Sequence, residues 1–200
     1  YETLAFHFRH SSLHQKAIDY LRNSGRKSLN KYAVQESHEY YQMGFQILEQ
    51  TRGDSEEEKL RLIDFLNEWG RVFYYRGDFR GMRKLFLEHE KLAESLSDTG
   101  LAGSFYVWLS ISLFNSGRVK EAFGVNLKAL EMCQKGKNTA IDMGYANIIW
   151  CCAELNLLEK GMQYSEEVMA HKEELDPMGY VLSLGGLGMI HIFKGDSQKN

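Results

Sequence analysis

The sequence predicts an all-α solenoid of antiparallel helix hairpins that repeat about every 40 residues. Short turns recur at an even stride, because Gly77, Gly117 and Gly195 lie 40 and then 78 residues apart and Asn156 lies 39 residues from each neighbour. Between the turns, apolar residues recur at spacings of three and four, as in Leu62, Ile63, Leu66, Trp69 and Phe73. The only proline is Pro177, whereas sheet-rich folds need frequent breakers between short strands.

Composition agrees with such an array and argues against other classes. The 200 residues are 44% hydrophobic and 12% aromatic, enough for a continuous core. A net charge of -3 gives no electrostatic reason to expect nucleic acid. The longest apolar stretch, near 180–193, is too short to span a bilayer, so no membrane partner is expected. Cys133, Cys151 and Cys152 lack metal spacing and no signal peptide is visible, which favours a reducing, cytoplasmic setting.

We expect one solenoid over 1–200, and because the chain begins without methionine we expect it to be a piece of a longer protein. The expected units are an N-terminal helix in 1–12, hairpins in 13–50, 56–97, 99–135 and 137–175, and an incomplete repeat in 177–200. Residues 13–29 fit either the second helix of an opening hairpin or the first helix of the next one. Ser55 before three glutamates and Asp176 before Pro177 indicate helix starts. Gly161 and Gly188, at fixed offsets from the turns, are expected at close helix contacts.

The residues around the turns resemble the tetratricopeptide repeat. The second repeat matches that family's pattern with Leu66, Trp69, Gly70, Phe73, Gly77, Phe79, Met82 and Phe86, and the third with Tyr106, Leu109, Ser110, Leu113, Gly117, Val119, Ala122 and Ala129. The stride exceeds the family's usual period of about 34 residues, which indicates longer helices. The resemblance implies a right-handed superhelix that is not an enzyme and that binds a protein or peptide in a concave groove.

The resemblance also implies which residues line that groove. In the first half of the chain they are Arg22, Asn23, Arg26, Asn30, Asp64, Asn67, Glu68, Arg71, Tyr74 and Tyr75; in the second half they are Trp108, Phe114, Asn115, Asn147, Trp150 and Glu154. Asparagines pin a peptide backbone, arginines bind carboxylates and aromatic rings add contact area. The alternative is a solvated face with some aromatics turned into the core, first among them Trp108 and Trp150. The lysines of the family's two-carboxylate clamp are absent, so a chaperone C-terminal tail is not the expected ligand.

The first 41 residues are similar to the start of the helical repeat region that follows the ATPase module in large bacterial signalling proteins, including ATPases fused to nucleotide cyclases, kinases or LuxR-type regulators. The similarity rests on Tyr1 to Phe8, Lys16 to Leu21, Ser24-Gly25, Tyr32-Ala33, Glu36-Ser37 and Tyr40-Tyr41. It implies a sensor or interaction arm in signal transduction. The alternative is a small-ligand-sensing regulatory domain that closes around a metabolite.

Three short motifs suggest chemistry, but the repeat pattern explains them better. His7, His10 and His14 would bind zinc only if they converged, and Ser11-Ser12 is expected to break the helix before His14. The glycines of 185–188 have no preceding strand and no following Lys-Ser/Thr, so they are not a phosphate-binding loop. Arg-Gly-Asp at 76–78 occupies a repeat turn. No catalytic residue, cofactor or metal is therefore expected.

Segment 178–193 is expected to be the first helix of a hairpin whose partner would start after Asn200. It is rich in apolar residues, namely Leu182, Leu184, Leu187, Met189, Ile190, Ile192 and Phe193. Because a repeat without a polar cap exposes apolar surface, we expect self-association through 178–193.

Overall fold

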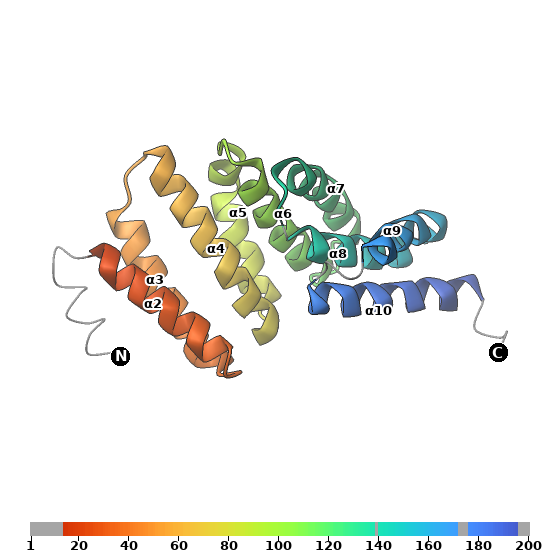
Figure 1. The fold of residues 1–200 in the computed structure, drawn as a ribbon, viewed down its shortest axis with the longest axis horizontal. Coiled ribbons are helices and arrows are strands. Elements are labelled where there is room, and N and C mark those ends of the chain that lie inside the picture. Colours follow the sequence, from red (N-terminus) through yellow and green to blue (C-terminus); the bar gives the residue numbers. More distant parts are fainter. Residues whose placement is uncertain (1–13, 139, 172–175, 196–200) are drawn as a thin grey trace. The chain divides into compact units, whose positions relative to one another are not determined.

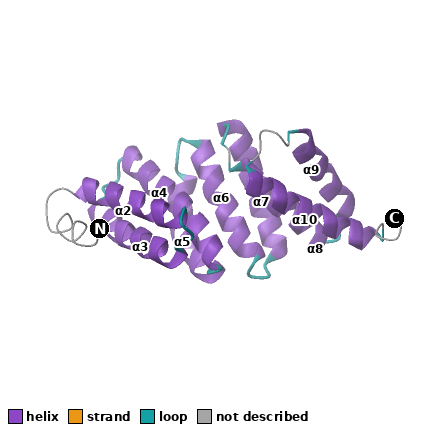
Figure 2. Cartoon of the chain, turned by 60° about the horizontal axis from the view of Figure 1, so that its bottom comes forward, coloured by secondary structure: helices purple, strands orange, loops and turns teal. Residues whose placement is uncertain are grey.

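The computed structural model describes residues 14–138, 140–171 and 176–195, and all regular structure within them is α-helical (Figure 2). The helices are α2 (His14–Leu29), α3 (Val34–Thr51), α4 (Glu56–Arg76), α5 (Phe79–Glu94), α6 (Thr99–Phe114), α7 (Val119–Gly136), α8 (Ile141–Glu154), α9 (Leu158–Ala170) and α10 (Pro177–Lys194). The predicted all-α class is confirmed for this part of the chain. The helix expected in 1–12 lies outside the described residues.

The chain forms two compact units, one up to Gly81 and one from Met82 onward. Unit 1 contains α2, α3 and α4, and unit 2 contains nearly all of α5 together with α6 to α10. In unit 1, α2 packs on α3 and α3 packs on α4 (Figure 1). Residues 14–29 therefore form a hairpin with the helix that follows them. The expectation of one solenoid over 1–200 stays a prediction.

All four predicted turn positions adopt left-handed backbone geometry, with φ of 71° at Gly77, 76° at Gly117, 57° at Asn156 and 76° at Gly195. Glycine has no Cβ to clash in this region, and asparagine is among the side chains that tolerate it best. Each residue directs its backbone N–H to a carbonyl three residues earlier, as Gly117 does to Phe114 at 2.9 Å. The predicted stride is thus a series of helix ends built alike.

The predicted helix starts are also present. Ser55 accepts a hydrogen bond from the Glu58 N–H at 3.3 Å, and the Glu58 carboxylate accepts one from the Ser55 N–H at 3.3 Å, which is a reciprocal capping box. The Asp176 carboxylate accepts from the Met178 N–H at 2.8 Å while Pro177 fills the first helical position. Local sequence therefore fixes where α4 and α10 begin.

In unit 2, α6 packs against α7, α8 against α9, and α10 against both α8 and α9 (Figure 1). The approach of α10 to α8 depends on two glycines seven residues apart: a Cβ at Gly179 would lie 2.9 Å from the Asp142 Cβ, and one at Gly186 would lie 2.7 Å from the Ile149 Cγ2. At Gly161 a Cβ would lie 2.4 Å from the Ile190 Cδ1, so close packing is confirmed there.

The close-packing role predicted for Gly188 is wrong, because no atom lies within 4 Å of a Cβ built there. Gly188 lies on the exposed face of α10, opposite the face that carries Gly179 and Gly186. Among the described residues, no helix has the length and apolar character that crossing a membrane requires.

Candidate binding sites

Two predicted groove arginines of unit 1 are already neutralised by acids of the same unit. Arg22 pairs with Asp64 and Glu68, and Arg26 pairs with Glu68. The Nε atoms of both arginines lie 2.9 Å from the Glu68 Oε2, and the Tyr41 hydroxyl donates to the same oxygen at 3.0 Å. We call these five residues the α2–α4 ion cluster.

The members of the cluster change one another's pKa values. Burial alone would raise the pKa of Glu68, but hydrogen bonds from Arg22 and Arg26 outweigh it and lower the pKa to about 2. Burial also raises the pKa of Tyr41, and the neighbouring Glu68 carboxylate acts in the same direction. Arg22 and Arg26 therefore already have carboxylate partners within unit 1. They join α2 to α4, and their assignment as peptide-binding residues stays a prediction.

The remaining groove residues of unit 1 have different surroundings. Asn23 is exposed, whereas Asn67 is buried and so does not face a ligand, which corrects that assignment. Tyr74 is half-buried, with its ring 5.9 Å from that of Phe79. Arg71 and Tyr75 are exposed one turn apart on α4.

Arg71 and Tyr75 meet the α2–α3 turn in a small cavity of about 240 Å³, which we call the Arg71 pocket. Its lining is Leu29, Asn30, Tyr32, Val34, Arg71 and Tyr75. The turn holds Tyr32 at a φ of 59° and leaves its side chain 86% exposed beside the pocket. Three of the predicted groove residues, Asn30, Arg71 and Tyr75, are thus brought together.

Arg71 differs from Arg22 and Arg26 in that no acid pairs with its charge among the described residues. Within the part of the chain that the structure describes, no hydrogen bond or ion pair involves its guanidinium group. A planar guanidinium with unused donors binds a carboxylate through two parallel hydrogen bonds. Neighbouring tyrosine rings add contact area at a modest entropic cost. The Arg71 pocket therefore suits an acidic group of a ligand.

In unit 2 two predicted groove residues lie in the core instead. Trp108 is buried within α6, and Asn147 is buried on α8 with its Nδ2 donating to the Ser110 Oγ at 2.9 Å. Ser110 in turn donates to the Asn126 Oδ1 at 2.9 Å, and the Asn126 Nδ2 donates to the Gly144 carbonyl at 2.7 Å. This buried network joins α6, α7 and α8. The assignment of Trp108 and Asn147 to a ligand surface is corrected.

The other predicted residues of unit 2 do not converge on one site. Trp150 is half-buried and donates from Nε1 to the Leu182 carbonyl at 2.9 Å, so it holds α10 against α8. Phe114 is half-buried, and the exposed Asn115 donates to the Ile111 carbonyl of its own helix at 2.9 Å. Glu154 is exposed at the end of α8.

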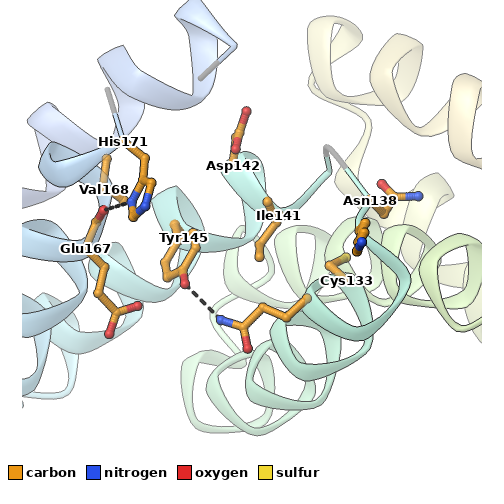
Figure 3. A pocket seen from close by; sticks show the side chains of 10 residues that line it. Cys133, Asn138, Ile141, Asp142, Tyr145, Glu167, Val168 and His171 are labelled. Carbon is orange, nitrogen blue, oxygen red and sulfur yellow. Dashed lines mark hydrogen bonds between the residues drawn. The ribbon is translucent and has the colours of Figure 1, made fainter. Parts of the chain in front are cut away.

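A larger cavity, of about 670 Å³, lies where α7 ends, α8 begins and α9 ends (Figure 3). We call it the Asp142 pocket; it is lined by Cys133, Gln134, Lys137, Asn138, Ile141, Asp142, Tyr145, Glu167, Val168 and His171. The Gln134 Nε2 donates to the Tyr145 hydroxyl at 3.0 Å. The His171 Nδ1 lies 3.1 Å from the Glu167 carbonyl oxygen (Figure 3).

Sequence reasoning did not find this pocket, and no spacing in the sequence would have shown it. Its lining comes from three helix ends, each contributing two to four residues at ordinary helical spacing. The only local signal is Asp142, an acid at the start of a largely apolar helix. Burial raises the pKa of its carboxyl group, although the hydrogen bond from the Asp176 N–H acts in the opposite direction.

The cysteines offer little nucleophilic chemistry. Cys133, Cys151 and Cys152 are buried free thiols. Burial raises the pKa of Cys133 and Cys151 to about 12 and that of Cys152 to about 11, so the thiols stay protonated at neutral pH. No group of three or more His, Cys, Asp or Glu residues within 14–138, 140–171 and 176–195 could hold a metal ion. Of the predicted histidine cluster, His7 and His10 lie outside the described residues.

Comparison with solved structures identifies the architecture. A crystal structure of a putative kinesin light chain from Podosopora anserina with nearly identical TPR-like repeats matches with a TM-score of 0.68 and 14% identity over 91% of this chain and 89% of that one. A variant of it matches with 0.72 and 14% over 95% and 92%. BtubC (BKLC) from P. vanneervenii matches with 0.70 and 15% over 99% and 80%. The chain has a tetratricopeptide-like repeat fold.

These likenesses concern the fold, since sequence identity is low. No family model and no curated protein matches the sequence. The helix hairpins, their left-handed turns and the resemblance read from the sequence agree with a tetratricopeptide-like scaffold. Such scaffolds commonly bind protein partners on extended helical surfaces.

Proposed function

We propose that this chain is a non-catalytic scaffold that binds a protein or peptide partner, with the Arg71 pocket as the contact for an acidic group of that partner. The observation that carries the proposal is the difference between the arginines of unit 1. Arg22 and Arg26 are neutralised by Asp64 and Glu68. Arg71 is exposed beside Asn30 and two tyrosines, and no acid among the described residues pairs with it. An unneutralised arginine beside aromatic rings is typical of the residues that dominate protein interfaces.

We further propose that the scaffold is the sensor or interaction arm of a larger bacterial signalling protein. The support is the similarity of residues 1–41 to the repeat region that follows an ATPase module in such proteins. Binding at the Arg71 pocket would then report the presence of the partner to domains elsewhere in the parent protein. This assignment is tested by measuring the signalling output of the parent protein with and without the Arg71→Ala substitution.

Fluorescence anisotropy with labelled synthetic peptides tests the binding function directly. Each peptide is made in an acidic form and in a form with glutamine in place of glutamate, and the acidic form is also made with an amidated C-terminus. We expect the acidic forms to bind more tightly to the wild-type protein. Arg71→Ala should weaken them by about tenfold or more, the usual effect of losing one charge-assisted hydrogen-bonding group.

Arg80→Ala is the matched control, because Arg80 is an exposed arginine of the same unit outside the pocket. It should leave the affinities unchanged. Equal binding of acidic and neutral peptides, or equal loss in the two variants, would show that Arg71 does not select the partner.

We also propose that α10 mediates association with a second copy of the chain. Its exposed side chains include Val181 at 63% and Ile192 at 57%, together with Leu184 and Phe193. No residue from Pro177 to Phe193 carries a formal charge apart from the titratable His191. Ile190 belongs instead to the core formed with Ile149 and Val168 and does not contribute to this face.

A further inference from the structure

The Asp142 pocket contains a buried carboxylate that pairs with no cation among the described residues. Asp142 is only 8% exposed, and the described residues bond only one of its oxygens, Oδ2, which accepts from the Asp176 N–H at 2.9 Å. A buried carboxylate is costly unless a positive group or several hydrogen bonds compensate it. A cation that enters the cavity would therefore gain more from Asp142 than from an exposed acid.

The other charges of the lining also favour a cation in this cavity. Glu167 on α9 also lines the cavity, beside Tyr145, and adds a second negative charge to the lining (Figure 3). Lys137 is exposed, and it follows the last residue of α7, where the negative end of the helix dipole offsets its charge. An anion would gain little from this hydrated lysine and would be repelled by two carboxylates.

The apolar part of the lining indicates what the cation carries. Ile141, Tyr145 and Val168 supply an aliphatic and aromatic wall, and the volume of about 670 Å³ lies within the usual range for small-molecule sites. We propose that the Asp142 pocket binds a small organic amine, with its ammonium group against the Asp142 carboxylate and its carbon skeleton against Ile141, Tyr145 and Val168. This is a small-molecule function, independent of peptide binding in unit 1.

Matched ligands test the proposal on the wild-type protein. Phenethylamine, phenethyl alcohol and hydrocinnamate share an aromatic skeleton and carry an ammonium group, a hydroxyl group and a carboxylate. Isothermal titration calorimetry and thermal unfolding should show binding and a raised melting temperature with phenethylamine, and with isopentylamine as an aliphatic amine, but not with the alcohol or the acid. Binding of the acid, or the absence of binding by both amines, would overturn the proposal.

Variants separate a binding role of Asp142 from a structural one. Asp142→Asn keeps an oxygen that accepts from the Asp176 N–H, so the unliganded protein should melt no lower than wild type, while amine affinity falls by about tenfold or more. Glu167→Gln should weaken binding less, and Lys137→Met should tighten it by removing a like charge. Glu166→Gln is the control, because Glu166 is exposed on the same helix outside the lining.

If Asp142→Asn fails to fold, the Lys137→Met and Glu167→Gln pair still decides the question. Opposite changes in amine affinity support an electrostatic site, and unchanged affinity in both refutes it. Because the two pockets belong to different units, Arg71→Ala should leave amine binding intact, so the failure of either assignment is recognised separately.

Discussion

Replacing Glu68 by glutamine removes the central carboxylate of the α2–α4 ion cluster and should destabilise unit 1 strongly. The carboxylate accepts hydrogen bonds from Arg22, Arg26 and Tyr41. Among the described residues, the variant leaves Arg22 paired with Asp64 and Arg26 without an acidic partner. The environment lowers the pKa of Glu68 from 4.5 to about 2. At about 1.36 kcal/mol per pKa unit, the ionised carboxylate stabilises the folded state by about 3 kcal/mol.

The pH dependence has a definite sign. Because the pKa of Glu68 is lower in the folded than in the unfolded state, the stabilisation is present above the unfolded value of 4.5 and is lost as the pH falls toward about 2. The difference in unfolding free energy between wild type and Glu68→Gln should be about 3 kcal/mol at about pH 6 and should approach zero near pH 2.

Urea denaturation followed by the fluorescence of Trp69 measures this difference in unit 1. Both proteins carry Trp108→Phe and Trp150→Phe, which removes the tryptophans of unit 2. Glu57→Gln is the control, because Glu57 is exposed and pairs with Arg61 on its own helix; its effect should stay below about 0.5 kcal/mol. Equal stability of wild type and Glu68→Gln at about pH 6, or a difference that does not change with pH, would refute the reasoning.

Three further predictions concern unit 2. Asn126→Ala should lower the free energy of unfolding by about 2–3 kcal/mol in urea titrations, because the Gly144 carbonyl loses its buried donor; wild-type stability would contradict this. Asn156→Val should lower the melting temperature measured by circular dichroism while Asn156→Gly should not, since valine resists a positive φ; equal melting temperatures would exclude strain at this turn. Val181→Asp with Ile192→Asp should convert an associated species to a monomer in light scattering, and a wild-type protein that is monomeric at all concentrations would disprove association through α10.

The sequence was a good guide to backbone geometry because the turns are local. A left-handed residue needs glycine or asparagine at one position, and a capping box needs two residues three apart. Gly77, Gly117, Asn156 and Gly195 could therefore be located before any contact was known.

The surroundings of individual side chains could not be predicted, because they depend on contacts between helices that the spacing of residues does not reveal. Arg22 and Glu68 were both predicted to line the groove, but they pair with each other although they lie 46 residues apart in the chain. The predicted groove positions were assigned one residue at a time. Opposite charges on neighbouring helices can instead pair and neutralise each other. Arg71 differs from Arg22 and Arg26 in that it has no acidic partner among the described residues.

A sequence signal for the buried groove residues was present in α6. Between Thr99 and Phe114 that helix has no charged residue, and a helix that is apolar on all sides is expected in a core rather than along a binding surface. Trp108 is buried for this reason, and Asn147 is buried where α8 packs against α6. The α10 helix also lacks acids and has its only lysine at its last position, yet it leaves Val181 and Ile192 exposed. Two helices of similar composition thus differ in how completely they are covered, and this contrast is the physical reason to expect that α10 packs against another polypeptide surface.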